Sequence, residues 1–197
     1  MPSRSVDEEV RRALDALSRH GLMLMADAKR PSLTTLVAGK PIKGSWWGHP
    51  SGRRIFQVAG ALEDGGEVVF APLVDGKVTL VHRRLWPALV AIGEARAAWQ
   101  MDALSSEARL LLQQVDQVGR VRASGTDAKR LAVALLVHGE QVHTDRGSHA
   151  TELVSWAEFR RTRDIGVVPD RAKAQQALEQ AAFSLDPRAR LPWSERP

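Results

Sequence analysis

Residues 67–83 read EVVFAPLVDGKVTLVHR, two runs of β-branched and apolar residues on either side of Asp75-Gly76. An Asp-Gly pair between two such runs is the strongest short-range signal for a two-residue hairpin turn, because both turn positions need a positive φ. We therefore expect strands over residues 67–74 and 77–83. This hairpin is the reference point for assigning the segments on either side of it.

Helical patterns precede the hairpin. Residues 5–8, Ser-Val-Asp-Glu, have the form of a capping box, and apolar residues then recur at helical spacing up to Leu17. Pro31-Ser32 can open a second helix that Gly39 would end. The expected elements before the hairpin are a helix from residue 6 to 20, a strand over 22–25, and helices over 33–38 and about 53–62.

The order helix, strand, helix, helix, hairpin is that of a winged helix-turn-helix, in which a recognition helix and a β-hairpin contact a nucleic-acid duplex. About fourteen residues separate the second and third predicted helices, where a helix-turn-helix has about three or four. This loop is therefore an insertion with its own function, or the assignment is wrong.

The pattern starts again after a linking helix predicted over residues 85–99. Ser105 or Ser106 can cap the next helix, and Gly119 can end it. The further expected elements are a strand over 121–123, a helix over 126–138, a hairpin of 141–144 and 150–155 across residues 145–148, and a helix over 169–183.

We therefore predict an α+β chain of tandem winged-helix-like modules. The predicted units are residues 1–99, a module with a Trp-rich basic loop; residues 100–163, a second module; and residues 164–197, a C-terminal helix and tail.

Composition excludes several classes of protein. The chain has 197 residues, 44% of them hydrophobic and 26% charged, which is typical of a globular protein. It has no cysteine, which excludes disulfides, cysteine nucleophiles, zinc fingers and iron–sulfur clusters. No apolar run approaches the roughly 18 residues of a membrane span, so we expect a cytoplasmic protein with no membrane partner.

The net charge of +5 is unevenly distributed, with no acidic residue between Asp27 and Glu63 and none between Asp75 and Glu94. The first of these windows contains Lys29, Arg30, Lys40, Lys43, Arg53 and Arg54, and the second contains Lys77, His82, Arg83 and Arg84. Concentrated positive charge favours an anionic partner such as DNA, although a solvated basic face without a partner would have the same composition.

The densest group of candidate residues is the segment 43–50, which reads KGSWWGHP. Side chains of successive residues in an extended chain point to opposite sides, so Trp46 and Trp47 cannot both face a core. Aromatic rings beside cations suit unpaired or flipped bases, because the rings stack on bases and the cations hold phosphates. The alternative is that both rings seal the loop onto the rest of the fold.

Lys43 is the candidate nucleophile. An amine with a lowered pKa could form a Schiff base with the aldehyde of an abasic site, after which His49 or His82 could remove a proton and drive β-elimination. The alternative is that Lys43 only contacts phosphate.

Further side chains are candidates for contacts with nucleic acid. Of these, Arg84 shares a strand face with His82 at the base of the hairpin, where structural ion pairing is the competing interpretation. The full set of expected contacts is Lys40, Ser45, Trp46, Trp47, Arg53, Arg54, Lys77, Arg83 and Arg84.

We expect no metal and no cofactor. The spacings of His138, His143 and His149 match no standard zinc ligand set. No glycine-rich phosphate loop and no nucleophile elbow is present in the sequence.

Two segments carry a family resemblance. GSWWGHP at residues 44–50 and GKVTLVHRRLW at residues 76–86 resemble the signature of a family of uncharacterised, mostly bacterial proteins, which implies no particular activity. At the level of architecture, the predicted tandem modules are similar to the bacterial winged-helix DNA glycosylases that act on alkylated or crosslinked bases.

The sequence thus favours a protein that binds damaged or distorted DNA, with glycosylase or abasic-site lyase activity centred on residues 43–49. Two alternatives stay open. One is a non-catalytic winged-helix regulator that reads intact duplex, and the other is an interaction module whose tryptophans bind a protein partner. The oligomeric state is not indicated by the sequence.

Overall fold

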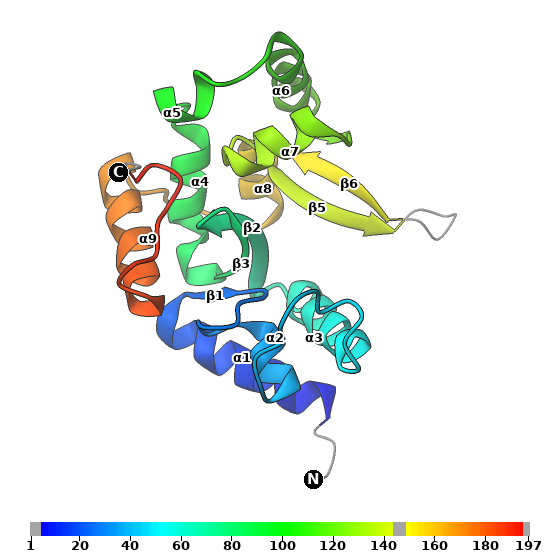
Figure 1. Cartoon of the computed structure of the whole chain (residues 1–197). Coiled ribbons are helices and arrows are strands. Elements are labelled where there is room, and N and C mark those ends of the chain that lie inside the picture. The colour runs from blue at the N-terminus through cyan, green and yellow to red at the C-terminus, as the bar shows by residue number, and fades with distance from the viewer. Residues whose placement is uncertain (1–4, 144–148, 195–197) are drawn as a thin grey trace.

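The predicted hairpin is present in the computed structural model, which describes residues 5–143 and 149–194. Strand β2 (Val68–Val74) pairs antiparallel with β3 (Lys77–His82), and β1 (Leu22–Leu24) pairs with the other edge of β3 (Figure 1). Asp75 and Gly76 have φ values of 52° and 68°, as the turn requires. The first sheet therefore has the order β1-β3-β2.

Three helices cover this sheet, and the first two have the predicted caps. They are α1 (Val6–His20), α2 (Leu33–Ala38) and α3 (Gly52–Asp64). The Ser5 side chain accepts a hydrogen bond from the Glu8 backbone N–H at 3.2 Å, and Ser32 caps α2 in the same way. A first hydrophobic cluster joins these helices to the sheet through residues such as Leu17, Val58 and Leu80.

The link to the second half is not the single helix predicted over residues 85–99. The chain forms a 3-10 turn, η1 (Arg83–Leu85), then α4 (Trp86–Glu94) and, after a break, α5 (Ala98–Met101). Arg96 has a φ of 48°, which no α-helix accommodates, and its guanidinium donates to Asp116 at 2.7 Å. This contact across 20 residues could not be seen in the local pattern.

The second half repeats part of the first. Its elements are α6 (Ser106–Val118), β4 (Arg120–Arg122), α7 (Thr126–Val133), β5 (His138–His143), β6 (His149–Val154) and α8 (Trp156–Thr162). The second sheet has the order β4-β6-β5, and it too is antiparallel throughout.

Two details of the second half differ from the prediction, and a third is not tested. The helix predicted over residues 126–138 ends at Val133, since Leu135 has a φ of 53° and the chain then enters β5. Helix α8 was not predicted. The predicted turn at residues 145–148 lies outside the described residues.

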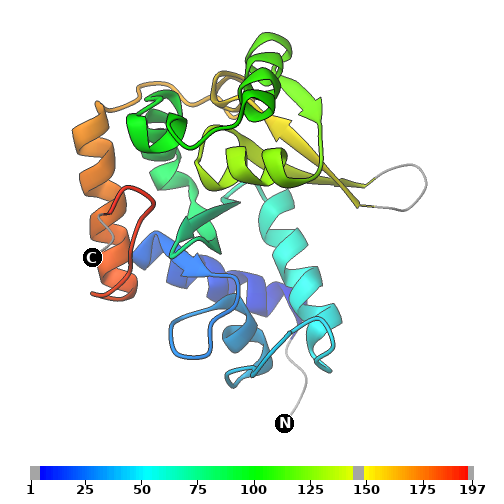
Figure 2. The same cartoon turned by 45° about the horizontal axis from the view of Figure 1, so that its top comes forward.

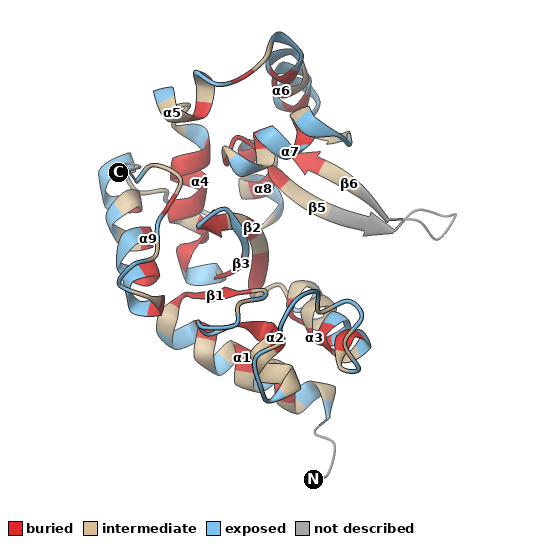
Figure 3. Cartoon of the chain, in the orientation of Figure 1, coloured by how far each residue is buried: buried red, intermediate tan, exposed pale blue. Residues whose placement is uncertain are grey.

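The final helix, α9 (Arg171–Leu185), runs alongside α4 in both views (Figures 1 and 2). A central hydrophobic cluster contains Val81, Leu89, Trp156 and Leu178, and so draws on all three predicted units. Each half also has a cluster of its own. The predicted α+β class is confirmed, and the units meet in a common core (Figure 3). No helix in the described part of the chain is long and apolar enough to span a membrane.

Gly93 of α4 and the indole of Trp156 make a close contact beside this central cluster. A Cβ atom at Gly93 would lie 2.0 Å from Trp156 Nε1. That Nε1–H donates to the Leu135 carbonyl at 2.7 Å, and the ring packs edge-on against Phe159. The indole therefore cannot move away from α4 without losing a buried hydrogen bond.

His138 is buried in the same region. Its ring lies 4.9 Å from the Phe159 ring between centroids, and its Nε2 has no hydrogen-bond partner among the described residues. Burial lowers the pKa of His138 to about 4, although the neighbouring Glu140 acts in the opposite direction. The folded protein thus holds His138 neutral at pH 7.

We predict that Gly93→Ala destabilises the protein by about 3 kcal/mol, because the added methyl group overlaps an indole that cannot shift. Gly60→Ala in α3 is the matched control: its Cβ would meet open space, and alanine should stabilise that helix by up to about 1 kcal/mol. Chemical denaturation of both variants measures the difference. Equal stabilities would show that the Gly93 contact is not a constraint.

We also predict that His138 makes the protein acid-sensitive. In the unfolded chain, His138 binds a proton below its ordinary pKa of 6.5. In the folded protein, it stays neutral until the pH falls to about 4. Stability should therefore fall by roughly 3 kcal/mol as the pH drops through this window, at about 1.36 kcal/mol per pH unit. In His138→Phe this part of the pH dependence should vanish, whatever the variant's stability at pH 7. An unchanged pH dependence of the unfolding free energy would contradict the assignment.

Candidate nucleic-acid interface

The loop of residues 39–51 joins α2 to α3 and ends in consecutive turns. The His49 backbone N–H donates to the Trp46 carbonyl at 3.1 Å, and the Gly52 N–H donates to the His49 carbonyl at 2.7 Å. The Ser51 N–H donates to His49 Nδ1 at 3.1 Å. These bonds hold the end of the loop against the first turn of α3.

Trp46 and Trp47 stack on each other, with ring centroids 4.0 Å apart and an angle of 23° between their planes. They lie on the same side because the turn replaces the extended backbone in which successive side chains point in opposite directions. Trp46 is half-buried, whereas Trp47 is 66% exposed. Phe56 on α3 lies 6.1 Å from Trp47 between centroids. The Trp47 ring thus packs on Trp46 on one side and is otherwise largely exposed.

Gly52 permits this arrangement. A Cβ atom at position 52 would lie 2.9 Å from the carbonyl oxygens of both Trp46 and Trp47. These are backbone atoms, so any side chain at this position would displace the turn that carries the two rings. The first residue of α3 is therefore coupled directly to the loop.

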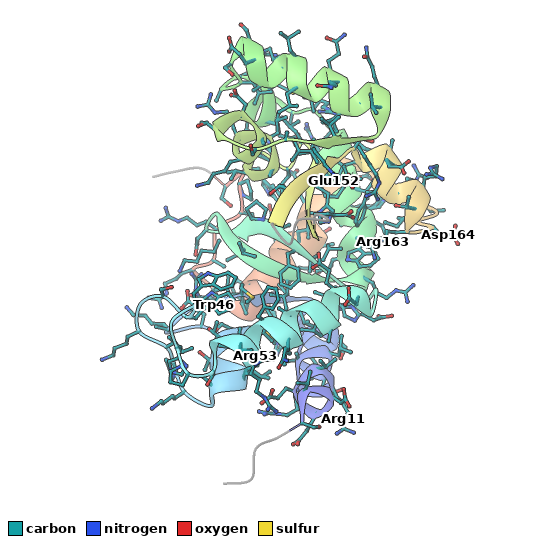
Figure 4. The ribbon with its side chains drawn as sticks, turned by 90° about the vertical axis from the view of Figure 1, so that its right-hand side faces the viewer. Arg11, Trp46, Arg53, Glu152, Arg163 and Asp164 are labelled. Carbon is teal, nitrogen blue, oxygen red and sulfur yellow. The ribbon has the colours of Figure 1, made fainter. Side chains whose placement is uncertain are left out.

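Three of the predicted contact cations lie exposed around this loop. Lys40, Lys43 and Arg53 have no acidic partner in the part of the chain that the structure describes, and Ser45 is also exposed. Figure 4 shows Trp46 and Arg53 close to the N-terminal half of α3. Arg54 differs, since its Nε donates at 2.6 Å to the buried Glu9.

The cations of the hairpin are engaged within the protein. Lys77 donates to Asp27 at 2.7 Å and Arg83 donates to Glu67 at 2.9 Å. Arg84 donates to the Arg19 carbonyl at 3.2 Å, and so holds the end of α1. Sequence reasoning could not distinguish these cations from those of the loop, because their partners lie far away along the chain.

The tip of the hairpin is clamped. Arg30 donates to Asp75 at 2.6 Å and also to Asp27. The Asp75 N–H donates to the Arg190 carbonyl at 2.8 Å, so the C-terminal segment lies over the turn. Burial opposes ionisation of Asp27, but hydrogen bonds from Lys77 and two backbone N–H groups outweigh it and hold the pKa of Asp27 well below its usual value.

The three candidate catalytic residues do not meet in one site. His82 pairs with Val68, beyond the C-terminal end of α3, whereas His49 lies at the N-terminal end of that helix. The 13 residues of α3 span roughly 20 Å. Burial lowers the pKa of His82 against the influence of Glu67, and its Nδ1 caps η1. Lys43 is exposed, so the surroundings do not supply the desolvation that activates a lysine.

The C-terminal end of α3 is acidic. Burial, with Glu140 nearby, raises the pKa of Glu63, and the neighbouring Asp64 adds a further negative charge. Arg120 binds Glu140 and Glu152 at 2.8 and 2.9 Å. Figure 4 places Glu152 and Arg163 well away from Trp46. An anionic ligand would therefore be favoured only at the N-terminal end of the helix.

Two cavities lie away from this loop. One of about 750 Å³ lies at the hairpin tip and includes Arg30 and Asp186 in its lining, and another of about 260 Å³ includes Arg96 and Trp156. No residue of the loop lines either cavity. Within the described residues, no group of three His, Asp or Glu side chains is placed to hold a metal ion. The side chains of His143 and His149 lie outside that description.

Sequence reasoning missed two contributors, Phe56 and Gln57. They follow Arg53 at the i+3 and i+4 positions of α3 and are exposed with it on one face. Helical spacing from Arg53 would have identified them.

We predict that Gly52→Ala displaces the Trp46–Trp47 stack without unfolding the protein, because only the loop turn must shift. Near-ultraviolet circular dichroism should lose the signal of the coupled indoles, while the far-ultraviolet spectrum stays the same. Gly60→Ala in the same helix should leave both spectra unchanged, since its Cβ meets open space. An unaltered near-ultraviolet spectrum in Gly52→Ala would contradict the contact.

Comparison with known proteins adds no family assignment. No protein-family model, no curated protein and no solved structure matches the chain. The functional argument therefore depends on the site itself.

Proposed function

We propose that the protein binds damaged or distorted DNA through the loop of residues 39–51 and the N-terminal half of α3. We further propose that its two halves are winged-helix-like modules. The chain order of helix, strand, helix, helix and hairpin, with a sheet of order β1-β3-β2, supports this interpretation for the first half. The order β4-β6-β5 supports it for the second, which has one helix fewer before its hairpin.

One observation carries the proposal: an ordered, exposed indole beside exposed cations without acidic partners. A base that stacks on an aromatic side chain contributes about 1 to 3 kcal/mol, and lysine and arginine hold phosphates. Lys40, Lys43 and Arg53 are the cations concerned. The absence of acidic residues between Asp27 and Glu63 means that no nearby carboxylate in the sequence opposes them.

The hairpin has a smaller role in this proposal than in an ordinary winged helix. Its tip is bound by Arg30 and the C-terminal segment, and Lys77 is paired with Asp27. We therefore propose a mainly structural role, through bonds within the protein, for Lys77, Arg54, Arg83 and Arg84. The proposed interface is then the loop and the start of α3.

We propose binding without bond cleavage, because Lys43 is exposed and His82 lies at the other end of α3. Borohydride trapping on abasic DNA tests this directly. We expect no trapped adduct. A trapped adduct that disappears in Lys43→Ala would instead establish an abasic-site lyase and identify its nucleophile.

We predict that replacing Lys40, Lys43 and Arg53 together by Ala weakens binding to DNA that contains a mismatch or an abasic site. The salt dependence of log K should become shallower by about 0.9 for each phosphate contact removed from a duplex. Fluorescence anisotropy over a salt series measures both effects. Arg83→Ala is the control, since its partner is Glu67, and should bind like the wild-type protein. Failure of the wild-type protein to bind DNA at about 50 mM salt would refute the proposal and favour a protein partner.

A further inference from the structure

The geometry points to a narrower ligand class for the proposed interface. We propose that it binds unpaired bases of a single-stranded segment, with a base stacked on the outer face of Trp47. This inference rests on the proposed function and deepens it. It distinguishes stacking on a surface from insertion of a flipped base into a pocket and from reading of an intact duplex.

One face of the Trp47 ring is free. Trp46 covers one face of Trp47 at a centroid distance of 4.0 Å, and Phe56 approaches at an angle of 45°. Trp47 is nevertheless 66% exposed. A planar base can therefore extend the stack that Trp46 and Trp47 begin, which is how single-strand-binding proteins use their aromatic residues.

The Trp47 ring is already held in place before a ligand binds. The ring does not need to be ordered on binding, because the turn bonds from His49 and Gly52 already fix the backbone that carries it. Trp46 in addition limits the rotation of Trp47 from behind. Ordering a large side chain at an interface costs about 0.5 to 1.5 kcal/mol, and here that cost is met when the chain folds.

The open position of Trp47 does not suit a flipped base. An enzyme that flips a base encloses it in a close-fitting pocket. The loop lines neither the cavity at the hairpin tip nor the one beside Trp156. An open ring with cations beside it is a platform, and a platform suits a base that is already unpaired.

The charges along α3 do not suit an intact duplex. The outward face of α3 carries Arg53 at its start and Asp64 at its end, next to the half-buried Glu63. A helix lying in a major groove would bring those carboxylates close to phosphates. A single strand can follow Lys40, Lys43 and Arg53 around the N-terminal end alone, where Glu9 is buried and hydrogen-bonded to Arg54.

The experiment compares short oligonucleotides that contain 2-aminopurine, a base whose fluorescence is quenched by stacking. A single strand and the blunt duplex of the same sequence are titrated with the full chain and with Trp47→Ala. For the single strand we expect quenching by the wild-type protein and, in Trp47→Ala, a loss of quenching and a roughly 5- to 150-fold loss of affinity. Duplex affinity should change by less than about 2-fold, within the range of a group that makes no contact.

Three further variants control the result. Leu110→Ala on α6 removes an apolar side chain that is also 66% exposed, and should change nothing. Trp47→Phe should recover part of the affinity, because a smaller ring still stacks. Gly52→Ala keeps every tryptophan but displaces the loop, and should behave like Trp47→Ala.

Two results overturn the inference in different ways. If Trp47→Ala weakens single strand and duplex equally, the stacking inference fails and the proposed binding function stands. If the wild-type protein binds neither oligonucleotide, the stacking inference fails, and the titration of mismatched or abasic DNA decides separately whether the proposed function fails with it. Circular dichroism of each variant shows whether a loss of binding reflects a loss of fold.

Discussion

The contact between Gly93 and Trp156 is the constraint on which the arrangement of the two halves depends. Glycine lets the indole lie against the backbone of α4, and the hydrogen bond to Leu135 then fixes the start of β5. The Trp156 indole also packs on the Phe159 ring, and the Phe159 ring in turn packs on the Trp86 ring. Both sheets and α9 are therefore positioned around α4, and a shift there would move every element that packs on it.

Within this frame, the cations fall into two groups. In the first group, Arg30 on the loop before α2 and Lys77 on the hairpin face carboxylates contributed by distant segments, Asp75 and Asp27 respectively. Such pairs connect the hairpin tip, residues 27–30 and the C-terminal segment, and so stabilise the fold. Among the cations of residues 40–54, Lys40, Lys43 and Arg53 lack such partners in the described part of the chain, and Arg54 is the exception. A net charge of +5 therefore says less about binding than the position of the unmatched charge.

The parts of the fold that could be predicted are those with local causes. Asp75-Gly76 defines its turn by its own backbone preferences, and Ser5, Ser32 and Ser105 cap helices through bonds to residues three positions on. The errors have distant causes. Arg96 leaves the helix to reach Asp116, and Lys77 is neutralised by a residue 50 positions earlier. The candidate site divides in the same way: KGSWWGHP was found from its composition, whereas the placement of His82 away from it depends on the length of α3.

The long loop between α2 and α3 costs the fold little. Each doubling of loop length adds about 0.6 kcal/mol of closure entropy, so extending a turn of three or four residues to the 13 residues of positions 39–51 costs roughly 1 kcal/mol. The larger cost is the exposure of Trp47, because burying a large apolar side chain is worth about 1.5 to 3 kcal/mol. The chain could recover that energy by turning the ring inward, yet the bonds of His49 and the close approach of Gly52 hold it outward. A ring that is ordered and exposed at the same time is suited to a partner that covers it, and the unmatched cations beside it are the reason for proposing an anionic one.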